Sequence, residues 1–296
     1  MPDGFDSHFI TAQDGLKLHV RSYGSRGAAR LPVMCLPGLA RTSADFHALA
    51  GALAGDAGRP RYVLAMDYRG RGLSDYDRDA DNYSLAVELA DVLAVLTALG
   101  IGSAVFVGTS RGGILAMLLG SRRPAAIAGV VLNDIGPVID TRGLVRIKSY
   151  VGRLPHPKTF EEGAEFLRRL FGPQFPARTP DQWLEHARCM FRDTGGGIVP
   201  DYDPKLARVL QDIDIERAPP PLWTEFDSLA RVPMMVIRGA NSDVLSAATV
   251  EAMRARRQQC DTVVVPDQGH APFLTDAGII RRIGDFIAAC EPSGAP

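Results

Sequence analysis

A G-x-S-x-G sequence at residues 108–112 constrains the fold of this chain more than any other feature. The apolar run before it, residues 103–107, predicts a short buried strand, and the apolar stretch 113–120 predicts the first turns of a helix. Gly108 and Gly112 flank Ser110 because a turn leading directly from a strand into a helix brings two backbones too close for side chains. Such a turn exposes the Ser110 hydroxyl at the carboxyl end of a sheet, so we predict that Ser110 is a nucleophile.

The charge balance argues against binding to polyanions. The 296 residues include 33 Lys and Arg and 34 Asp and Glu, giving a net charge of −1. Such a chain has no electrostatic attraction for nucleic acid or for an acidic membrane face. Hydrophobic residues make up 46% of the chain, which is enough to form a sizeable core. We therefore expect a folded protein without nucleic-acid or membrane partners. Independently of the charge balance, we expect a small-molecule substrate and a monomer or homodimer.

The cysteines and histidines show no metal-binding or disulfide spacing. The four cysteines are scattered, and the six histidines form no H-x-H or H-E-x-x-H pattern. The first residues lack the apolar core of a signal peptide, and no apolar run reaches the length of a membrane span. These features predict reduced thiols, no metal, no cofactor and a cytoplasmic location.

Strands and helices alternate over two parts of the chain. Apolar runs predict strands at residues 32–36, 62–66, 105–107, 127–132, 233–237 and 262–265. Helices are predicted at residues 44–54, 85–99, 114–119, 247–257 and 279–290. A hairpin of residues 8–11 and 16–23 precedes them. The alternation predicts an α/β fold with a mostly parallel sheet, an antiparallel N-terminal hairpin and helices on both faces.

The alternation stops in the middle of the chain. From residue 137 to 229 there is no strand pattern, but residues 161–171 and 182–191 are amphipathic helical stretches punctuated by turns and prolines. We therefore predict a core of residues 1–136 and 230–296, with residues 137–229 as a helical insertion between two strands.

A serine nucleophile needs a base, and three histidines follow Ser110. His156 and His186 lie in the helical insertion, where an isolated polar residue is the simpler interpretation. His270 follows the predicted strand 262–265, so it lies at the same sheet edge as Ser110. We predict that His270 is the general base.

The base in turn needs an orienting acid, and two aspartates are candidates. Asp243 follows the strand 233–237, and Asp134 follows the strand 127–132. Either loop can reach the histidine from the sheet edge. We favour Asp243 because it lies on the later strand, and Asp134 remains open as the acid or as a structural carboxylate at the start of the insertion. Asp267 is too close to His270 along the loop to face its ring.

Backbone N–H groups must stabilise the negative oxygen that forms when a serine attacks an acyl group. One donor is expected from Arg111, the residue after the nucleophile. The other is expected from the loop Leu36-Pro37-Gly38-Leu39, where Gly38 allows a sharp turn and leaves the Leu39 N–H as the donor. We predict an oxyanion hole of the Leu39 and Arg111 amides.

Together these motifs resemble the α/β-hydrolase superfamily over nearly the whole chain. The resemblance includes the hairpin, Leu36 to Leu39, the D-x-R-G-x-G-x-S segment at 67–74, the serine turn, Asp243 and Gly269-His270. Many members have His-Gly where this chain has Pro37-Gly38, which keeps the backbone donor and loses a supporting histidine. The resemblance implies that residues 137–229 form a cap over Ser110, and that the D-x-R-G-x-G-x-S segment shapes the rim of the site. We interpret Asp67, Arg69 and Ser74 as structural.

The resemblance further implies a serine hydrolase that cleaves carboxylic esters through an acyl-enzyme on Ser110. A carbon–carbon bond hydrolase, a lactonase and a cofactor-free perhydrolase use the same three residues and stay open, because fold and triad do not fix the substrate. A small-molecule receptor is a further alternative, disfavoured because the chain carries no signalling or DNA-binding domain. Aromatic and apolar residues of the cap would partly line the pocket (Phe160, Phe166, Phe171, Trp183, Met190, Phe191, Trp223), although most are expected in the core of the cap.

Overall fold

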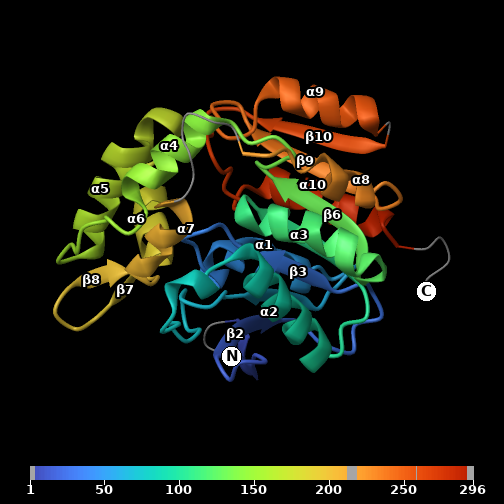
Figure 1. Cartoon of the computed structure of the whole chain (residues 1–296), viewed down its shortest axis with the longest axis horizontal. Helices are drawn as coiled ribbons and strands as arrows, with labels where there is room; N and C mark the ends of the chain where they lie inside the picture. The colour runs from blue at the N-terminus through green and yellow to red at the C-terminus, as the bar shows by residue number, and fades with distance from the viewer. Residues whose placement is uncertain (1–3, 212–218, 258, 292–296) are drawn as a thin grey trace.

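The strands form one large, mostly parallel sheet (Figure 1) in a computed structural model that describes residues 4–211, 219–257 and 259–291. Its order is β1-β2-β4-β3-β5-β6-β9-β10. β1 (Asp6–Thr11) pairs antiparallel with β2 (Lys17–Tyr23), which pairs antiparallel with β4 (Val63–Met66). The remaining strands pair parallel: β3 (Val33–Leu36), β5 (Ala104–Thr109), β6 (Ile127–Asn133), β9 (Met234–Gly239) and β10 (Cys260–Val265). The predicted hairpin and parallel sheet are confirmed.

Helices cover both faces of this sheet, as predicted. α1 (His47–Ala54) and α10 (Ala277–Ala289) lie on one face; α2 (Leu85–Ala98), α3 (Arg111–Arg122), α8 (Trp223–Ser228) and α9 (Ala247–Arg256) lie on the other. Successive strand residues alternate between the two cores: Val33 and Cys35 pack with α1 and α10, while Met34 and Leu36 pack with the opposite layer. Because both faces are buried, the strands are apolar at almost every position.

Most of the segment between β6 and β9, up to residue 211, lies over the carboxyl edge of the sheet, on the left in Figure 1. It contains α4 (Thr141–Tyr150), α5 (Phe160–Phe171), α6 (Pro180–Met190), β7 (Phe191–Asp193), β8 (Ile198–Pro200) and α7 (Arg208–Gln211). A capping box begins α6, with the side chains of Thr179 and Gln182 bonded to each other's backbone N–H. Short 3-10 helices occur at Ser43–Phe46, Ala80–Asn82, Pro124–Ala126, Gly172–Gln174 and Pro204–Ala207.

The expectation that this segment contains no strands was wrong. β7 and β8 form a two-stranded antiparallel sheet, joined by a turn that contains Gly195 and Gly197, both with positive φ. Each strand is three residues long, too short to show a period of two in the sequence. The last helix of the segment, α8, packs against α3, where Leu229 lies close beside Gly120.

The D-x-R-G-x-G-x-S segment forms a buried polar network after β4. The carboxylate of Asp67 accepts hydrogen bonds from Nδ1 of His19 (2.7 Å) and the Ser43 amide (2.6 Å). Arg69 donates two hydrogen bonds of 2.7 Å to Asp91 on α2. These bonds tie the loop to the first hairpin and to α2, as expected for structural residues.

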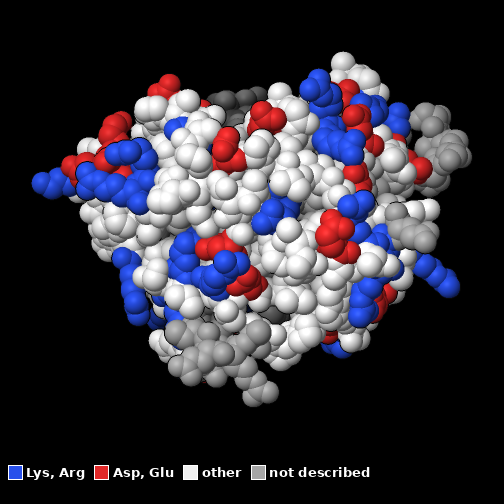
Figure 2. Space-filling view, turned by 90° about the horizontal axis from the view of Figure 1, so that it is seen from above, with Lys and Arg blue, Asp and Glu red and all other residues white. Residues whose placement is uncertain are grey.

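Basic and acidic side chains are interspersed on the face seen in Figure 2, separated by broad uncharged areas. Opposite charges on the surface of the molecule are paired in several cases, including Arg142 with Asp140 and Arg256 with Asp227. This face therefore offers no extended basic surface of the kind that binds a nucleic-acid backbone.

Candidate active site

Ser110 occupies a strained turn between β5 and α3. Its φ is 51°, a value that residues with a Cβ rarely adopt. A Cβ added to Gly108 would lie 2.5 Å from the carbonyl carbon of Gly112, and one added to Gly112 would lie 2.0 Å from the carbonyl oxygen of Leu36. Both glycines are thus required by the close approach of α3 to β5 and β3, and the predicted strand–turn–helix arrangement at Ser110 is confirmed.

Three polar side chains form a hydrogen-bonded chain at the carboxyl edge of the sheet. Nε2 of His270, in the loop after β10, lies 2.8 Å from Oγ of Ser110. Nδ1 of the same ring lies 2.8 Å from Oδ2 of Asp134, directly after β6. The side chains of His270 and Asp134 are 7% and 0% exposed. A carboxylate at Nδ1 favours a ring with its proton on Nδ1, which leaves Nε2 to accept the proton of Ser110.

The prediction that Asp243 orients His270 is therefore wrong in its geometry. Asp243 follows β9 and turns toward α4, where its carboxylate accepts hydrogen bonds from Nε (2.6 Å) and Nη2 (2.8 Å) of Arg146. Burial raises the pKa of Asp243, but the hydrogen bonds and charge of Arg146 outweigh it and lower the pKa overall. Asp243 thus joins the sheet edge to the overlying segment, and Asp134, the alternative left open by the sequence, contacts the histidine.

The neighbouring strand holds Asp134 in place. The Gly239 amide donates to Oδ1 of Asp134 (2.8 Å), and the Ser242 hydroxyl donates to Oδ2 (2.5 Å). The backbone of Asp134 itself has a positive φ of 54°, stabilised by an N–H bond of 2.7 Å to the carbonyl of Ile237. With His270 as a third donor, both carboxylate oxygens accept hydrogen bonds, and these fix the orientation of the carboxylate.

Leu39 and Arg111, the predicted oxyanion-hole residues, line the same cavity as Ser110. A Cβ on Gly38 would be 3.9 Å from Cβ of Ser110, so the loop after β3 lies against the serine. The loop is a tight turn in which the Arg41 N–H bonds to the Gly38 carbonyl (3.3 Å). Arg111 begins α3, where backbone N–H groups at a helix N-terminus face outward. The two amides remain predicted donors.

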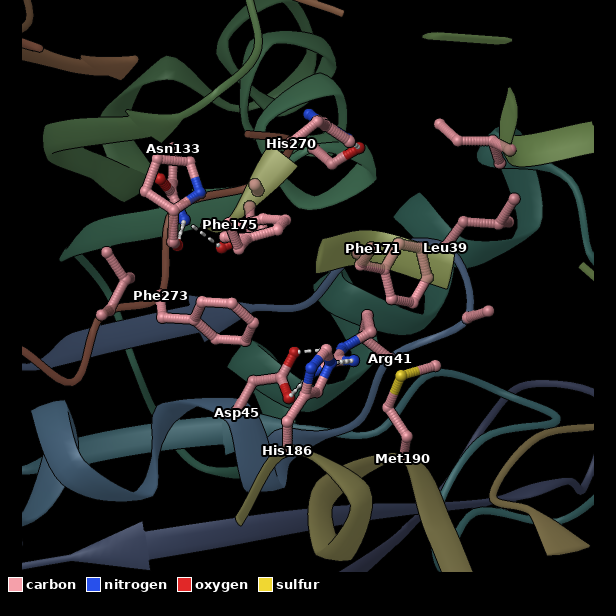
Figure 3. A pocket seen from close by; sticks show the side chains of 18 of the residues that line it. Leu39, Arg41, Asp45, Asn133, Phe171, Phe175, His186, Met190, His270 and Phe273 are labelled. Atoms are coloured by element: carbon pink, nitrogen blue, oxygen red, sulfur yellow. Dashed lines mark hydrogen bonds and ion pairs between the residues drawn. The ribbon is translucent and has the colours of Figure 1, made fainter. Parts of the chain in front are cut away.

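Two cavities meet at Ser110, and Leu39 lines both of them. The first, here the α6 cavity, is walled by apolar residues such as Phe171, Met190 and Phe273 (Figure 3). The second, here the α3 cavity, includes Arg111, Ile114, Ile135, Leu144 and Leu222 among the described residues. Of the aromatic and methionine side chains expected to line the pocket, Phe171 and Met190 do so; Trp183 and Phe191 are buried in the core. Phe160, Phe166 and Trp223 pack partly buried against that core.

The α6 cavity also has a polar end that the sequence did not indicate. Arg41 donates to both carboxylate oxygens of Asp45 and, through Nη1, to Nε2 of His186 (2.5 Å), as the dashed lines in Figure 3 show. Burial, reinforced by the charges of Arg41 and Arg178, holds the pKa of His186 well below its ordinary value of 6.5. His186 is therefore neutral, with one ring nitrogen committed to Arg41. His186 lines the α6 cavity, whereas the sequence favours an isolated polar residue of the insertion.

In the described part of the chain, no three His, Cys, Asp or Glu side chains group closely enough to hold a metal ion. The four cysteines are free. Of the described helices, none is both long and apolar enough to cross a bilayer.

Comparison with known proteins decides the family. Residues 33–282 match the model described as the alpha/beta hydrolase family. The chain belongs to this family. A crystal structure of an alpha/beta hydrolase from Novosphingobium aromaticivorans superposes with a TM-score of 0.88 at 40% identity, covering 96% of this chain and 98% of that one. The predicted α/β-hydrolase fold is therefore confirmed.

Two curated relatives match along nearly their whole length. A 3-hydroxybutyrate-oligomer hydrolase from Cupriavidus necator is 34% identical over 94% of this chain and 96% of its own. A 2-(acetamidomethylene)succinate hydrolase from Mesorhizobium japonicum is 25% identical over 95% of this chain and 96% of its own. The relatives are hydrolases of different substrates, so the family identifies this chain as a hydrolase and leaves its reaction to be argued from the site.

Proposed function

We propose that this alpha/beta hydrolase cleaves carboxylic esters through an acyl-enzyme on Ser110. The observation that carries the proposal is the hydrogen-bonded chain from Oγ of Ser110 through His270 to Asp134, with 2.8 Å at each step. A serine hydroxyl becomes an effective nucleophile when a base takes its proton and an acid orients that base. The carboxylate of Asp134, which is buried and accepts hydrogen bonds at both oxygens, suits the role of the acid.

The proposed reaction has two halves. Ser110 Oγ attacks the ester carbonyl while Nε2 of His270 takes its proton, and the carbonyl oxygen gains a negative charge that faces the amides of Leu39 and Arg111. The tetrahedral intermediate collapses, His270 gives its proton to the leaving alcohol, and the acyl group stays on Ser110. Water, deprotonated by His270, then attacks the acyl-enzyme and releases the acid, with the proton returning to Ser110.

We further propose short oligoesters of a hydroxy acid as the substrate class. The α6 and α3 cavities both open at Ser110, so one can take the acyl side of the scissile bond and the other the alcohol side. A chain cleaved between two of its units needs room on both sides. The relative named 3-hydroxybutyrate-oligomer hydrolase supports this class. Such oligomers carry a free carboxylate, and the guanidinium of Arg41, which lines the α6 cavity, can donate to it through the N–H groups that its bonds to Asp45 and His186 do not use.

The decisive experiment compares reaction types on the purified protein. The dimer and trimer of 3-hydroxybutyrate, p-nitrophenyl butyrate and a vinylogous 1,5-diketone are incubated separately, and products are followed by chromatography. We expect repeated turnover of the oligomers and of the p-nitrophenyl ester, and no cleavage of the diketone. Diketone cleavage without ester hydrolysis would replace the proposal with carbon–carbon bond hydrolysis. Binding of the esters without product release would indicate a receptor.

A further inference from the structure

A buried carboxylate on α2 connects the two residues of the predicted oxyanion hole. Glu88 is completely buried, and each of its oxygens faces a different arginine. Oε2 accepts a hydrogen bond of 2.5 Å from Nε of Arg111. Oε1 lies 2.7 Å from Nη1 of Arg71. The first arginine follows the nucleophile, and the second belongs to the loop after β4.

The arginine of that loop extends the connection to the other side of the serine. Nε of Arg71 donates to the backbone carbonyl of Leu39 (2.8 Å), and Nη1 donates to the carbonyl of Arg69 (2.6 Å). An unbroken series of contacts thus runs from the Leu39 carbonyl through Arg71 and Glu88 to the side chain of Arg111. Nη2 of Arg111 also donates a hydrogen bond of 2.9 Å to the Tyr83 carbonyl, which is a second restraint on this side chain.

We propose that Glu88 is a positioning residue that sets the spacing of the Leu39 and Arg111 amides. The inference rests on the proposed function, because the oxyanion exists only during acyl transfer. Backbone donors stabilise an oxyanion well only when they are held beforehand at the correct distance from it. The loop after β3 and the start of α3 are separate parts of the chain. The buried Glu88 carboxylate restrains the first through Arg71 and the second through Arg111.

The charge of the cluster and its geometry predict opposite effects on acylation when Glu88 is neutralised. The two roles can therefore be separated by experiment. Two guanidinium groups share one carboxylate, so the site is already one positive charge in excess. Burial lowers the pKa of Arg71, the charge of Glu88 opposes this, and Arg111 adds to the lowering. Neutralising Glu88 would add to the excess positive charge beside the oxyanion. A purely electrostatic role therefore predicts faster acylation when Glu88 is neutralised, and a positioning role predicts slower acylation.

A matched control lies one turn further along the same helix. Asp91 is also a buried carboxylate on α2, and it accepts two hydrogen bonds of 2.7 Å from Arg69. None of the bonds described for its carboxylate reaches Leu39 or Arg111. Asp91→Asn therefore removes a comparable buried charge without touching the oxyanion residues.

The test compares Glu88→Gln and Asp91→Asn with the wild type on p-nitrophenyl butyrate. We expect kcat of Glu88→Gln to fall by about ten- to a hundredfold with KM changed less than about threefold, because an interaction made only in the transition state is lost. The Ki of an alkylboronic acid, which forms a tetrahedral adduct with serine, should rise by a similar factor. Asp91→Asn should lower the unfolding temperature but keep kcat within about twofold of the wild type.

A second variant covers the case in which Glu88→Gln does not fold. Arg111→Met keeps the backbone N–H and leaves Glu88 paired with Arg71, and we expect the same loss of kcat and of boronic acid affinity. An unchanged or higher kcat in the folded Glu88 variant, or in Arg111→Met if the former does not fold, would overturn the positioning role while leaving ester hydrolysis intact. An equal loss in Asp91→Asn would overturn it too. A wild type without esterase turnover would overturn the proposed function, and the inference with it.

Discussion

Oδ2 of Asp134 lies 2.8 Å from Nδ1 of His270, although 136 residues separate the two along the chain. β6 and β9 are adjacent strands, and β9 in turn neighbours β10, so the loops that carry these residues end at one sheet edge. The contact identifies Asp134 as the carboxylate that orients the histidine. Asp243 pairs instead with Arg146.

The first prediction separates the two aspartates. Asp134→Asn should lower kcat for an ester by about ten-thousandfold, because His270 would lose its preferred tautomer and the imidazolium its stabilising charge. Asp243→Asn should lower kcat by less than about tenfold, since it only weakens a contact to α4. Steady-state kinetics of both variants on p-nitrophenyl butyrate measure this. The reverse order would return Asp243 to the role of the acid.

The sequence predicts those elements and site residues whose signals lie close together along the chain. The strands of the large sheet, the outer helices, the turn at Ser110 and the loop of His270 all have signals within about ten residues, whereas β7 and β8 are too short to show one. The acid was misassigned because Asp134 and Asp243 both follow strands at the same edge, and the sequence does not show which carboxylate turns inward. The donors that decide it, Gly239 and Ser242, lie more than a hundred residues from Asp134.

The other side-chain contacts that the sequence does not indicate are long-range. Arg41 and His186 are 145 residues apart and meet only because α6 folds over the loop after β3. The spacing of Arg41 and Asp45, four residues apart, was the one local sign of this polar cluster. The pairing of the Glu88 and Arg111 side chains has no local signal either, because the two residues meet only where α2 packs beside α3.

A second prediction concerns the size of the α6 cavity. Phe171→Ala or Met190→Ala should shift the ratio of kcat/KM between short and long acyl esters by about ten- to two-hundredfold, because each change adds room for extra methylene groups. Phe166→Ala is the control, since Phe166 is a half-buried aromatic of α5 that is not among the described lining residues. Ester panels from acetate to palmitate give the profile. If the cavity variants keep the wild-type chain-length profile, the overlying segment does not set specificity.

The polar end of the cavity leads to a third prediction. The double variant Arg41→Gln/Asp45→Asn removes a cation and its partner together, so no buried charge is left unpaired. The preference for the free acid of a 3-hydroxybutyrate trimer over its methyl ester should fall by about tenfold, because a charge-assisted contact to the carboxylate is lost. Competition between the two substrates in one vessel measures the ratio directly. An unchanged ratio would place carboxylate recognition elsewhere.

The lowered pKa of His186 predicts how acid affects stability. A group whose pKa is depressed on folding contributes stability above its unfolded pKa of 6.5, and that stability is lost as pH falls below this value. His186→Gln should therefore reduce the loss of unfolding free energy on acidification, by up to about 1.4 kcal/mol for each pH unit below 6.5. Urea unfolding at about pH 8 and pH 5.5 tests this. The exposed His156, changed to Gln, is the matched control. A wild-type slope in His186→Gln would contradict the expectation.

Covalent labelling of Ser110 tests the central claim most directly. A fluorophosphonate probe should modify the wild type once, with the adduct on the peptide that contains Ser110 by mass spectrometry. Ser110→Ala should fold normally, take up no probe and lose ester turnover by about a million-fold, as expected when a serine nucleophile is removed. Labelling at a different serine, or ester turnover that survives in Ser110→Ala, would contradict the mechanism.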